Sequence, residues 1–183
     1  MKRILTLLII CILILSCSNN DAYFRMSDSF LKQLIQNNNI DSGTIMIYPY
    51  GDISFFPIGN SQLESELSPF FGNDVLNFIK VQSKISKEFA GDLRITSNQI
   101  HTEEVIQLQK ECKENNLAYW DIFESRFDTL ICISNPIFSI DKKYAFICFS
   151  IIANRQDGSN TCGIFENVNG EWKRIKSFNG SSS

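Results

Sequence analysis

The side chains best suited to chemistry in this chain are its cysteines. The 183 residues include six Cys: Cys11, Cys17, Cys112, Cys132, Cys148 and Cys162. Thiols can form disulfides, bind a metal ion or act as nucleophiles, and their spacing and partners decide between these roles. No two of them have the Cys-x-x-Cys spacing of zinc and redox sites. The sequence therefore predicts no metal site and no cofactor, and it leaves structural and lipid chemistry for the thiols.

The first seventeen residues have the pattern of a secretory signal. Lys2 and Arg3 precede an apolar run from Ile4 to Leu15. A run of about twelve residues is typical of a signal peptide and is too short for a transmembrane helix, which needs about twenty. Residues 14–17 read Ile-Leu-Ser-Cys. They resemble the bacterial lipobox, whose Cys receives a diacylglyceryl group before the signal is cut. The alternative is a plain signal peptide or a signal anchor, with an incidental thiol at Cys17.

Lipidation at Cys17 predicts a protein held on a membrane surface. The expected organisation is a signal peptide over residues 1–16, a lipidated Cys and tether over 17–23, a single domain over 24–180 and a frayed tail over 181–183. Two or more acyl chains, palmitate among them, hold a protein stably on a bilayer, where one chain does not. Ser18, and not Asp, follows the lipidated residue. This context favours the outer membrane and leaves open which of its faces carries the protein.

The charge balance excludes some partners. The full sequence has a net charge of −3, and loss of Lys2 and Arg3 with the signal lowers it to −5. Nucleic-acid binding requires a positive field, which this composition does not provide. Attraction to anionic lipid is excluded as the anchor for the same reason. The expected membrane contact is therefore the acyl chains on Cys17.

The other thiols are candidates for a disulfide, because a cell envelope is oxidising and four internal Cys are available. Cys132, Cys148 and Cys162 fall in the C-terminal third, where strands are expected. A Cys132–Cys148 or a Cys148–Cys162 bridge would join neighbouring strands if their Cα atoms lie within about 7 Å. Free buried thiols are the alternative, because unpaired Cys behaves as a small apolar residue. We expect at most one bridge, with Cys112 buried and free.

Motifs of the common enzyme classes are missing from the sequence. It contains no Gly-x-Ser-x-Gly elbow, no Walker loop and no His-Glu-x-x-His pair. His101 is the single His, and we interpret it as a solvated loop residue. Residues 157–160 resemble a fragment of a calcium loop but lack its spaced oxygens and terminal Glu. A helix expected from Thr102 carries four acids on what we interpret as its solvated face: Glu103, Glu104, Glu111 and Glu114. These patterns predict a protein without catalytic activity.

Hydrophobic periodicity predicts helices and strands along the whole domain. Helices are expected over Asp28–Gln36, from Asn73 or Asp74 to about Gln82, over 102–115 with Thr102 as the cap, and over Leu117–Phe127. A strand is the alternative around residues 79–85, where apolar residues also alternate. Strands are expected at Thr44–Tyr48 and Leu93–Thr96, with a hairpin return at Ile53–Phe56. Pro49 and Pro57 favour a position near a sheet edge for the strand at Thr44–Tyr48 and its hairpin return, because Pro cannot donate a ladder hydrogen bond.

The final third is predicted to be a β-meander. Its strands are expected at Thr129–Ser134, Tyr144–Ile152 and Thr161–Val168, followed by a return after Asn169-Gly170. Tyr144–Ile152 is apolar on both faces and is expected to be central. The Asn-Gly pair favours a type I′ turn. That turn sets Val168 opposite Glu171, Glu166 opposite Lys173 and Ile164 opposite Ile175, with Phe165 and Trp172 on the other face.

Landmarks in the C-terminal part resemble one protein family. They are the Trp120-x-x-Phe123 pair, the stretch 134–141 (Ser-Asn-Pro-Ile-Phe-Ser-Ile-Asp), the Tyr144-Ala145 strand start and the Asn169-Gly170-Glu171-Trp172-Lys173 hairpin. The order resembles a group of small uncharacterised lipoproteins of Gram-negative envelopes, which share a Ser-x-Pro-x-Phe-Ser element and a closing Asn-Gly-x-Trp-Lys hairpin. Several of them carry a Cys-Gly-rich stretch, of which Cys162-Gly163 remains here. The resemblance implies an envelope location and lends no enzymatic activity.

Together these patterns predict an α+β domain whose C-terminal antiparallel meander is packed by N-terminal and central helices. We interpret Trp120, Phe123 and Trp172 as packing residues; a ligand contact by Trp172 or Tyr144 is the alternative. The leading functional hypothesis is a lipid-anchored, non-catalytic binding or structural module with a protein or glycan partner. One alternative is an immunity-type or inhibitor lipoprotein that neutralises a basic toxin or hydrolase. Another is an enzyme with an unrecognised site.

Overall fold

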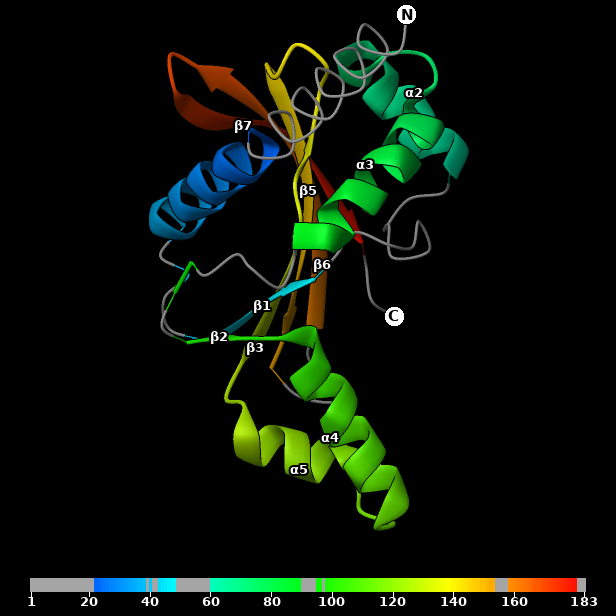
Figure 1. Ribbon diagram of the computed structural model, residues 1–183, viewed down its shortest axis with the longest axis vertical. Coiled ribbons are helices and arrows are strands. Elements are labelled where there is room, and N and C mark those ends of the chain that lie inside the picture. Colours follow the sequence, from blue (N-terminus) through cyan, green and yellow to red (C-terminus); the bar gives the residue numbers. More distant parts are fainter. Residues whose placement is uncertain are drawn as a thin grey trace, which may run out of the picture.

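A mixed β-sheet of seven strands forms the centre of the described part of the chain (Figure 1). The computed structural model describes residues 22–38, 40, 43–48, 60–89, 95–96, 98–153 and 158–180. The strands are β1 Thr44–Tyr48, β2 Gln99–Ile100, β3 Leu130–Ser134, β4 Ile137–Phe138, β5 Tyr144–Ile152, β6 Gly158–Val168 and β7 Glu171–Gly180. Their order across the sheet is β2-β1-β3-β5-β6-β7, and β4 also pairs with β5.

Strand β1 makes the sheet mixed. It pairs in parallel with β2 and with β3, whereas β3, β5, β6 and β7 pair antiparallel. The predicted α+β class and the C-terminal meander are therefore confirmed. As expected, β1 lies near a sheet edge, because of the described strands only the two-residue β2 lies outside it. Pro49 and Pro57 lie outside the described residues. The hairpin return expected at Ile53–Phe56 lies outside the described residues.

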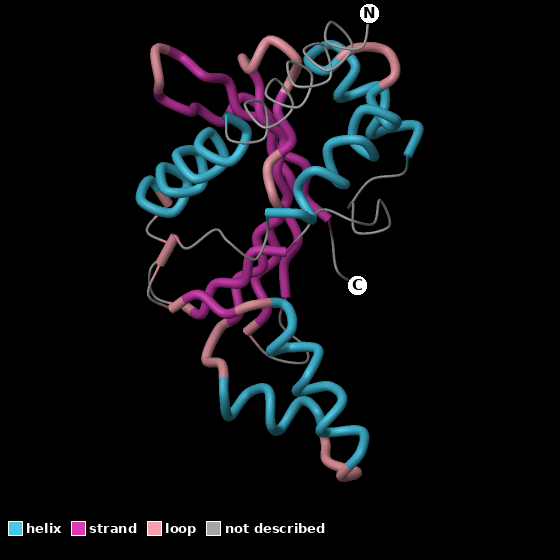
Figure 2. The backbone as a smooth tube through the Cα atoms, viewed as in Figure 1, coloured by secondary structure: helices cyan, strands magenta, loops and turns pink. Residues whose placement is uncertain are grey.

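Helices lie on both faces of the sheet (Figure 2). Their bounds are residues 22–37 for the N-terminal helix, Asn60–Phe71 for α2, Val75–Phe89 for α3, Thr102–Glu114 for α4 and Tyr119–Arg126 for α5. All but α2 were predicted, with different ends. The signal for α2 was an apolar stripe of Leu63, Leu67 and Phe71, spaced four residues apart and buried in the fold. Pro69, a residue that usually ends a helix, lies within α2 and obscured this stripe.

Successive side chains of β5 point to opposite faces of the sheet, and their contacts show which helices cover each face. Ala145 and Ile147 point to the side of the N-terminal helix, whereas Phe146 and Cys148 point to α2 and α3. Further along the strand, Ile152 faces α4 and α5. One face of the sheet therefore carries the N-terminal helix, and the other carries two helix pairs, α2–α3 and α4–α5, at opposite ends of the sheet (Figure 1).

The C-terminal hairpin follows its prediction only near the turn. Asn169 and Gly170 have the positive φ angles, 56° and 91°, that a type I′ turn requires. Val168 pairs with Glu171 and Glu166 with Lys173, as predicted. A β-bulge between Ile164 and Phe165 then shifts the register.

Because of the bulge, Ile164 pairs with Lys176, and the predicted pairing with Ile175 is wrong. A shift of one residue moves every later side chain to the other face. Trp172 lies between the turn and the bulge, so it keeps the predicted face and packs with Phe165 against Phe30 of the N-terminal helix; the Phe30 and Trp172 ring centroids are 5.1 Å apart. Phe178 lies beyond the bulge and packs on the α2–α3 side instead.

Two glutamines fasten helices to the sheet through pairs of hydrogen bonds. The Gln33 side chain donates to the Gly170 carbonyl (3.1 Å) and accepts from the Trp172 N–H (3.2 Å). The Gln82 side chain on α3 donates to the Phe138 carbonyl (2.8 Å) and accepts from the Phe138 N–H (3.0 Å). In each case the side-chain amide bonds backbone N–H and C=O groups as a neighbouring strand would. These bonds hold the N-terminal helix to the hairpin and α3 to β4.

The Ser-x-Pro-x-Phe-Ser element has a structural role. The Ser134 Oγ accepts a hydrogen bond from the Cys148 N–H (2.9 Å), and the Ser139 Oγ accepts one from the Tyr144 N–H (2.9 Å). Ser139 also donates to the Asp141 carboxylate, and this bond lowers the pKa of Asp141. The Pro136 carbonyl accepts from the Tyr23 hydroxyl (2.6 Å). These contacts shape the β3–β5 connection and give partners to the Ser134 and Ser139 hydroxyls and to the Pro136 carbonyl.

Two local expectations around residue 100 need correction. Ile95 and Thr96 are not in a strand, and the short strand of this region is β2 at Gln99–Ile100. The N-cap of α4 is His101, and Thr102 is its first helical residue. The His101 N–H donates to the Glu104 Oε1 (2.9 Å), so the acid predicted near this helix start closes the first turn. Within the described ranges, no helix combines the length and apolar character needed to cross a bilayer.

Candidate binding pocket

The floor of the candidate pocket is a row of side chains on three neighbouring strands. Met46 of β1 lies opposite Cys132 of β3, which lies opposite Ser150 of β5. Leu130 and Ile152 form the next row. Alternate residues of a strand share a face, and all five line the space beneath α4 and α5. Cys132 and Ser150 are small and leave space between the sheet and the helices at this level.

The walls come from the facing sides of α4 and α5. Thr102, Val105 and Gln109 recur every three or four residues along α4 and so share one side of the helix. On α5, Tyr119 and Trp120 lie one turn before Phe123, and all three line the pocket. The Trp120 ring lies edge-on to the rings of Tyr119 and Phe123, with centroids 5.4 Å away in both cases. The second wall is therefore an aromatic cluster.

The two wall helices are held to each other and to the sheet by their other sides. Leu108 and Cys112 of α4 are buried, with 1% and 3% of their surface exposed. They pack with Phe123 in the same apolar cluster. At the surface, the Arg126 guanidinium lies 3.6 Å from the Glu111 carboxylate and joins α5 to α4. The walls of the pocket are therefore two helices that are packed against each other and against the sheet.

The pocket has a volume of about 500 Å³ and is lined by eleven described residues, none of them charged. Pockets for small molecules usually span about 300 to 1,000 Å³ and have mostly apolar walls with a few polar groups. The polar groups here are the hydroxyls of Thr102, Tyr119 and Ser150, the Gln109 amide and the Cys132 thiol. Burial raises the pKa of Tyr119, while a hydrogen bond with Gln109 lowers it. The lining can therefore bind an apolar molecule and offer it a few neutral hydrogen bonds.

The Cys132 thiol is the most buried of these polar groups. Its residue is 7% exposed, and burial raises the pKa of the thiol from its usual 9.0 to about 12. A thiol at this pKa stays protonated at neutral pH, and the thiolate is the nucleophilic form. Cys132 thus contributes an apolar, polarisable surface to the floor and is not an activated nucleophile.

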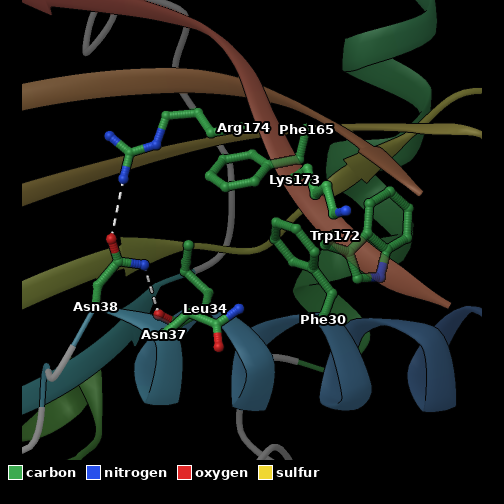
Figure 3. A pocket seen from close by; sticks show the side chains of 8 residues that line it. All are labelled: Phe30, Leu34, Asn37, Asn38, Phe165, Trp172, Lys173 and Arg174. Atoms are coloured by element: carbon green, nitrogen blue, oxygen red, sulfur yellow. Dashed lines mark hydrogen bonds between the residues drawn. The ribbon is translucent and has the colours of Figure 1, made fainter. Parts of the chain in front are cut away.

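A second concave region is a groove between the N-terminal helix and β7 (Figure 3). Its volume is about 300 Å³, and Figure 3 shows the Phe30, Phe165 and Trp172 rings gathered at one side. Arg174, on the other side, already donates to the Asn38 Oδ1 (3.0 Å) and lies over the Phe165 ring. Because its polar groups and aromatic rings are used to hold the helix on the sheet, we interpret this groove as a packing seam.

The four internal cysteines differ in the structure, because two form a disulfide and two are free thiols. Cys148 and Cys162 form a disulfide with Cα atoms 4.0 Å apart, one of the two pairings left open. They are direct partners on β5 and β6. Cys112 and Cys132 are free and buried. Cys17, the expected lipidation site, lies outside the described residues.

The other sequence candidates do not assemble into a site. His101 caps α4 and does not line the pocket. Of the four α4 acids, Glu103, Glu104 and Glu114 are exposed, and Glu111 is paired with Arg126. Across the described ranges, no three His, Cys, Asp or Glu side chains come together as a metal ion would require.

Sequence reasoning missed the pocket although it named several of its residues. Trp120 and Phe123 were interpreted as packing residues, and Phe123 is indeed 1% exposed. The available signal was Cys132 and Ser150, two small side chains inside strands of otherwise bulky residues. Their register across β3 and β5 is set by pairing, which the sequence does not state. Comparison of the chain with known protein families, with characterised proteins and with solved structures found no match.

Proposed function

We propose that this protein is a lipid-anchored ligand-binding module of the bacterial outer membrane, tethered through Cys17. Its ligand site is the pocket between α4–α5 and the sheet. The observation that carries the proposal is this open cavity of about 500 Å³, whose described lining carries no charge. A ligand that covers this mostly apolar lining removes apolar surface from water, which is favourable.

The membrane part of the proposal is supported by the sequence. Lys2 and Arg3, the apolar run and the Ser16-Cys17 pair occur in the order of a lipoprotein signal. These residues lie outside the described ranges. The described part of the N-terminal helix starts at residue 22, only a few residues after Cys17 in the sequence. A short tether of this kind keeps the domain close to the bilayer.

The non-catalytic part of the proposal is supported by the chemistry of the lining. General acid–base catalysis uses a side chain with a pKa near the working pH, placed against the substrate. The described residues that line the pocket are apolar, hydroxylic or amide, and the pKa of Cys132 is raised to about 12. Such groups hold and orient a ligand and do not transfer protons readily at neutral pH.

Native purification tests the proposal. The protein is extracted from envelopes in mild detergent, and molecules released on denaturation are identified by mass spectrometry. A Ser150→Leu variant, which fills the pocket, is expected to lose the released molecule, whereas Ser177→Leu on the exposed part of β7 keeps it. A molecule retained equally by both variants, or none from any sample, would overturn the proposed binding function.

The anchor is tested separately by Cys17→Ala. The variant is expected to lose labelling by radioactive palmitate and to leave the detergent phase, because the lipid is the only expected membrane contact. Mass spectrometry of the wild-type protein is expected to show an acylated Cys17 at the N-terminus. An uncut signal or an unmodified thiol would contradict the membrane part and leave the pocket untouched.

A second candidate function is inhibition of a basic toxin or hydrolase. Residues 102–128, which contain α4 and α5, include seven acidic and three basic residues and so carry a net charge of −4. Complementary charge accelerates association with a basic protein. Protection of cells against a co-encoded toxin, lost on deletion of the gene, would favour this candidate. Charge reversal at Glu103 and Glu114 would then weaken protection, whereas Ser150→Leu would not.

A further inference from the structure

We infer that the pocket takes a single uncharged hydrocarbon chain that ends in a neutral polar group such as a hydroxyl. The inference rests on the proposed binding function and names the chemical class of the ligand. A fatty acid or a cationic amphiphile is not expected to bind with its charged head group inside the pocket.

The first argument is the charge of the lining. Burial of an ion without a partner is very unfavourable. None of the described lining residues is a cation or an anion, from the floor at Cys132 to the walls at Gln109 and Trp120. A ligand whose charge enters the pocket would find no counter-ion there. The bound part of the ligand must therefore be neutral.

The second argument is the distribution of apolar surface. Met46, Leu130 and Ile152 lie on the floor and Val105 on one wall, all aliphatic. Unbranched Met adapts to flexible ligands and fills irregular gaps. The aromatic rings of α5 stand along a single wall and do not face another aromatic wall. A flat ring would be stacked on one side only, whereas a chain contacts aliphatic and aromatic walls alike.

The third argument is the presence of hydroxyl groups in the lining. The side chains of Ser150 and Thr102 line the pocket, and both residues are half-buried. A ligand that displaces water from their hydroxyls loses affinity unless it replaces the hydrogen bonds of that water. Cys132, beside Ser150 in the register, adds a weak thiol donor. These groups suit a neutral hydroxyl or carbonyl at the end of the chain.

The protein reports on the occupant through its own fluorescence. Trp120 lines the pocket, and Trp172 lies in a different cluster on the opposite face of the sheet. They are the only two Trp of the chain. Trp172→Phe therefore leaves one reporter in the pocket, and Trp120→Phe leaves one outside it. Bromine quenches Trp emission only at short range. Quenching of one Trp and not of the other therefore shows where the brominated chain binds.

The experiment uses three probes with the same decyl chain and a terminal bromine: bromodecanol, bromodecanoate and a bromodecyl-trimethylammonium salt. Each is titrated, below its micelle concentration, into the full-length protein carrying Trp172→Phe. Bromodecanol is expected to quench Trp120 saturably, and the two charged probes to bind at least about tenfold more weakly because their head groups must lose hydration. In Trp120→Phe the remaining emission should stay unchanged.

Pocket-filling variants give a second measurement that does not depend on replacing a Trp. Ser150→Leu in the wild-type background is expected to weaken bromodecanol binding at least about tenfold, because the added side chain occupies the floor. Ser177→Leu makes the same change on the exposed part of β7 and should bind as the wild type does. If Trp172→Phe does not fold, the loss of quenching between these two variants decides the question.

The outcomes separate the ligand class from the proposed function. Equal affinity for the three probes, or quenching of Trp172 alone, overturns the inference. Failure of all three probes overturns it too, but a different molecule or a protein that co-purifies only when Ser150 is intact would preserve the binding function. Saturable, neutral-selective quenching of Trp120 that Ser150→Leu abolishes supports it. If the native protein releases a long-chain alcohol or acylglycerol, its ligand comes from the bilayer. If it binds only soluble alcohols, its ligand is a free molecule in solution.

Discussion

Two helix pairs cover the same face of the sheet, and they pack against it differently. We call the region beneath α2–α3 the closed half and the region beneath α4–α5 the open half. In the closed half, the sheet contributes the Phe146 and Phe178 rings, whose centroids are 6.3 Å apart. In the open half, the sheet contributes Cys132 and Ser150, and a pocket remains. Side-chain size on the strands, and not the presence of helices, decides where this domain has room for a ligand.

The two halves also differ in their cysteines. Cys148 and Cys162 are bonded in the closed half and tie β5 to β6. Cys132 in the open half is free, although it lies on the adjacent strand β3 and is also buried. The closed half therefore has a covalent link as well as a filled core. We expect it to provide the stability that lets the open half keep an incompletely filled interior.

The largest expected effect comes from deleting a ring in each half. Phe146→Ala should lower the free energy of unfolding by about 4 kcal/mol, because the ring is fully enclosed. Phe123→Ala should cost about 1 kcal/mol less, because Phe123 lines the open pocket, so water can reach the space that the ring leaves. Urea unfolding followed by far-UV circular dichroism measures both values. Equal losses would mean that the open half is packed as tightly as the closed half.

The disulfide should give the next largest effect. The double variant Cys148→Ala, Cys162→Ala should lower the free energy of unfolding by about 3 kcal/mol, because the bond closes a short loop with a sequence separation of 14. Cys132→Ala in the open half should cost only about 1 kcal/mol, a usual value for a point substitution. Thiol titration of the denatured, non-reduced protein should find Cys112 and Cys132 reactive. Reaction of all four internal thiols would contradict the bond.

Enlarging a valine in each half gives a matched test of space. Val75→Phe in the closed half should lower the free energy of unfolding by about 2 kcal/mol, because Val75 is fully buried in a filled core. Val105→Phe on the wall of the pocket should change it by less than about 0.5 kcal/mol, because the ring has empty volume to enter. Thermal unfolding compares the two. A large loss at Val105 would argue that the pocket walls cannot adjust.

The smallest expected effect is an alkaline sensitivity confined to the open half. Burial raises the pKa of the Cys132 thiol from 9.0 to about 12, so the thiol ionises first in the unfolded chain. The unfolded state then binds fewer protons than the folded state, and stability falls as pH rises above 9.

Between about pH 8 and about pH 10 the loss due to Cys132 should be about 1 kcal/mol. Cys132→Val should remove this part of the pH dependence, whereas the Cys148–Cys162 disulfide does not titrate. Free energies of unfolding at both pH values measure the difference between wild type and variant. An identical pH dependence in the two proteins would show that the thiol is not buried.

Local signals predicted much of the fold. The Asn169-Gly170 turn formed as expected, because both residues tolerate the required positive φ whatever surrounds them. β1 and β5 have the predicted bounds, because runs of β-branched and aromatic residues favour strands on their own. The start of α4 was placed within one residue through the acids of its first turn.

Features that depend on distant partners were not predicted. The bulge beside Phe165 brings Phe178 to the α2–α3 core. The packing of Phe178 in that core stabilises the bulge, and this contact joins residues from separate parts of the chain. The parallel pairing of β1 with β3 joins segments more than eighty residues apart. The pocket has the same origin, because Cys132 and Ser150 become neighbours only through the β3–β5 register.

The sequence by itself determined the signal-like N-terminus, the acidic balance, the helical and extended segments and the Asn-Gly hairpin turn. Each of these follows from composition or from residues a few positions apart, whose preferences act within one turn or strand. The tertiary structure alone decided which thiols bond, which face of the sheet each helix covers and where a cavity remains. Those outcomes depend on register and on the volumes of side chains from separate strands and helices, and these are fixed only when the whole sheet assembles.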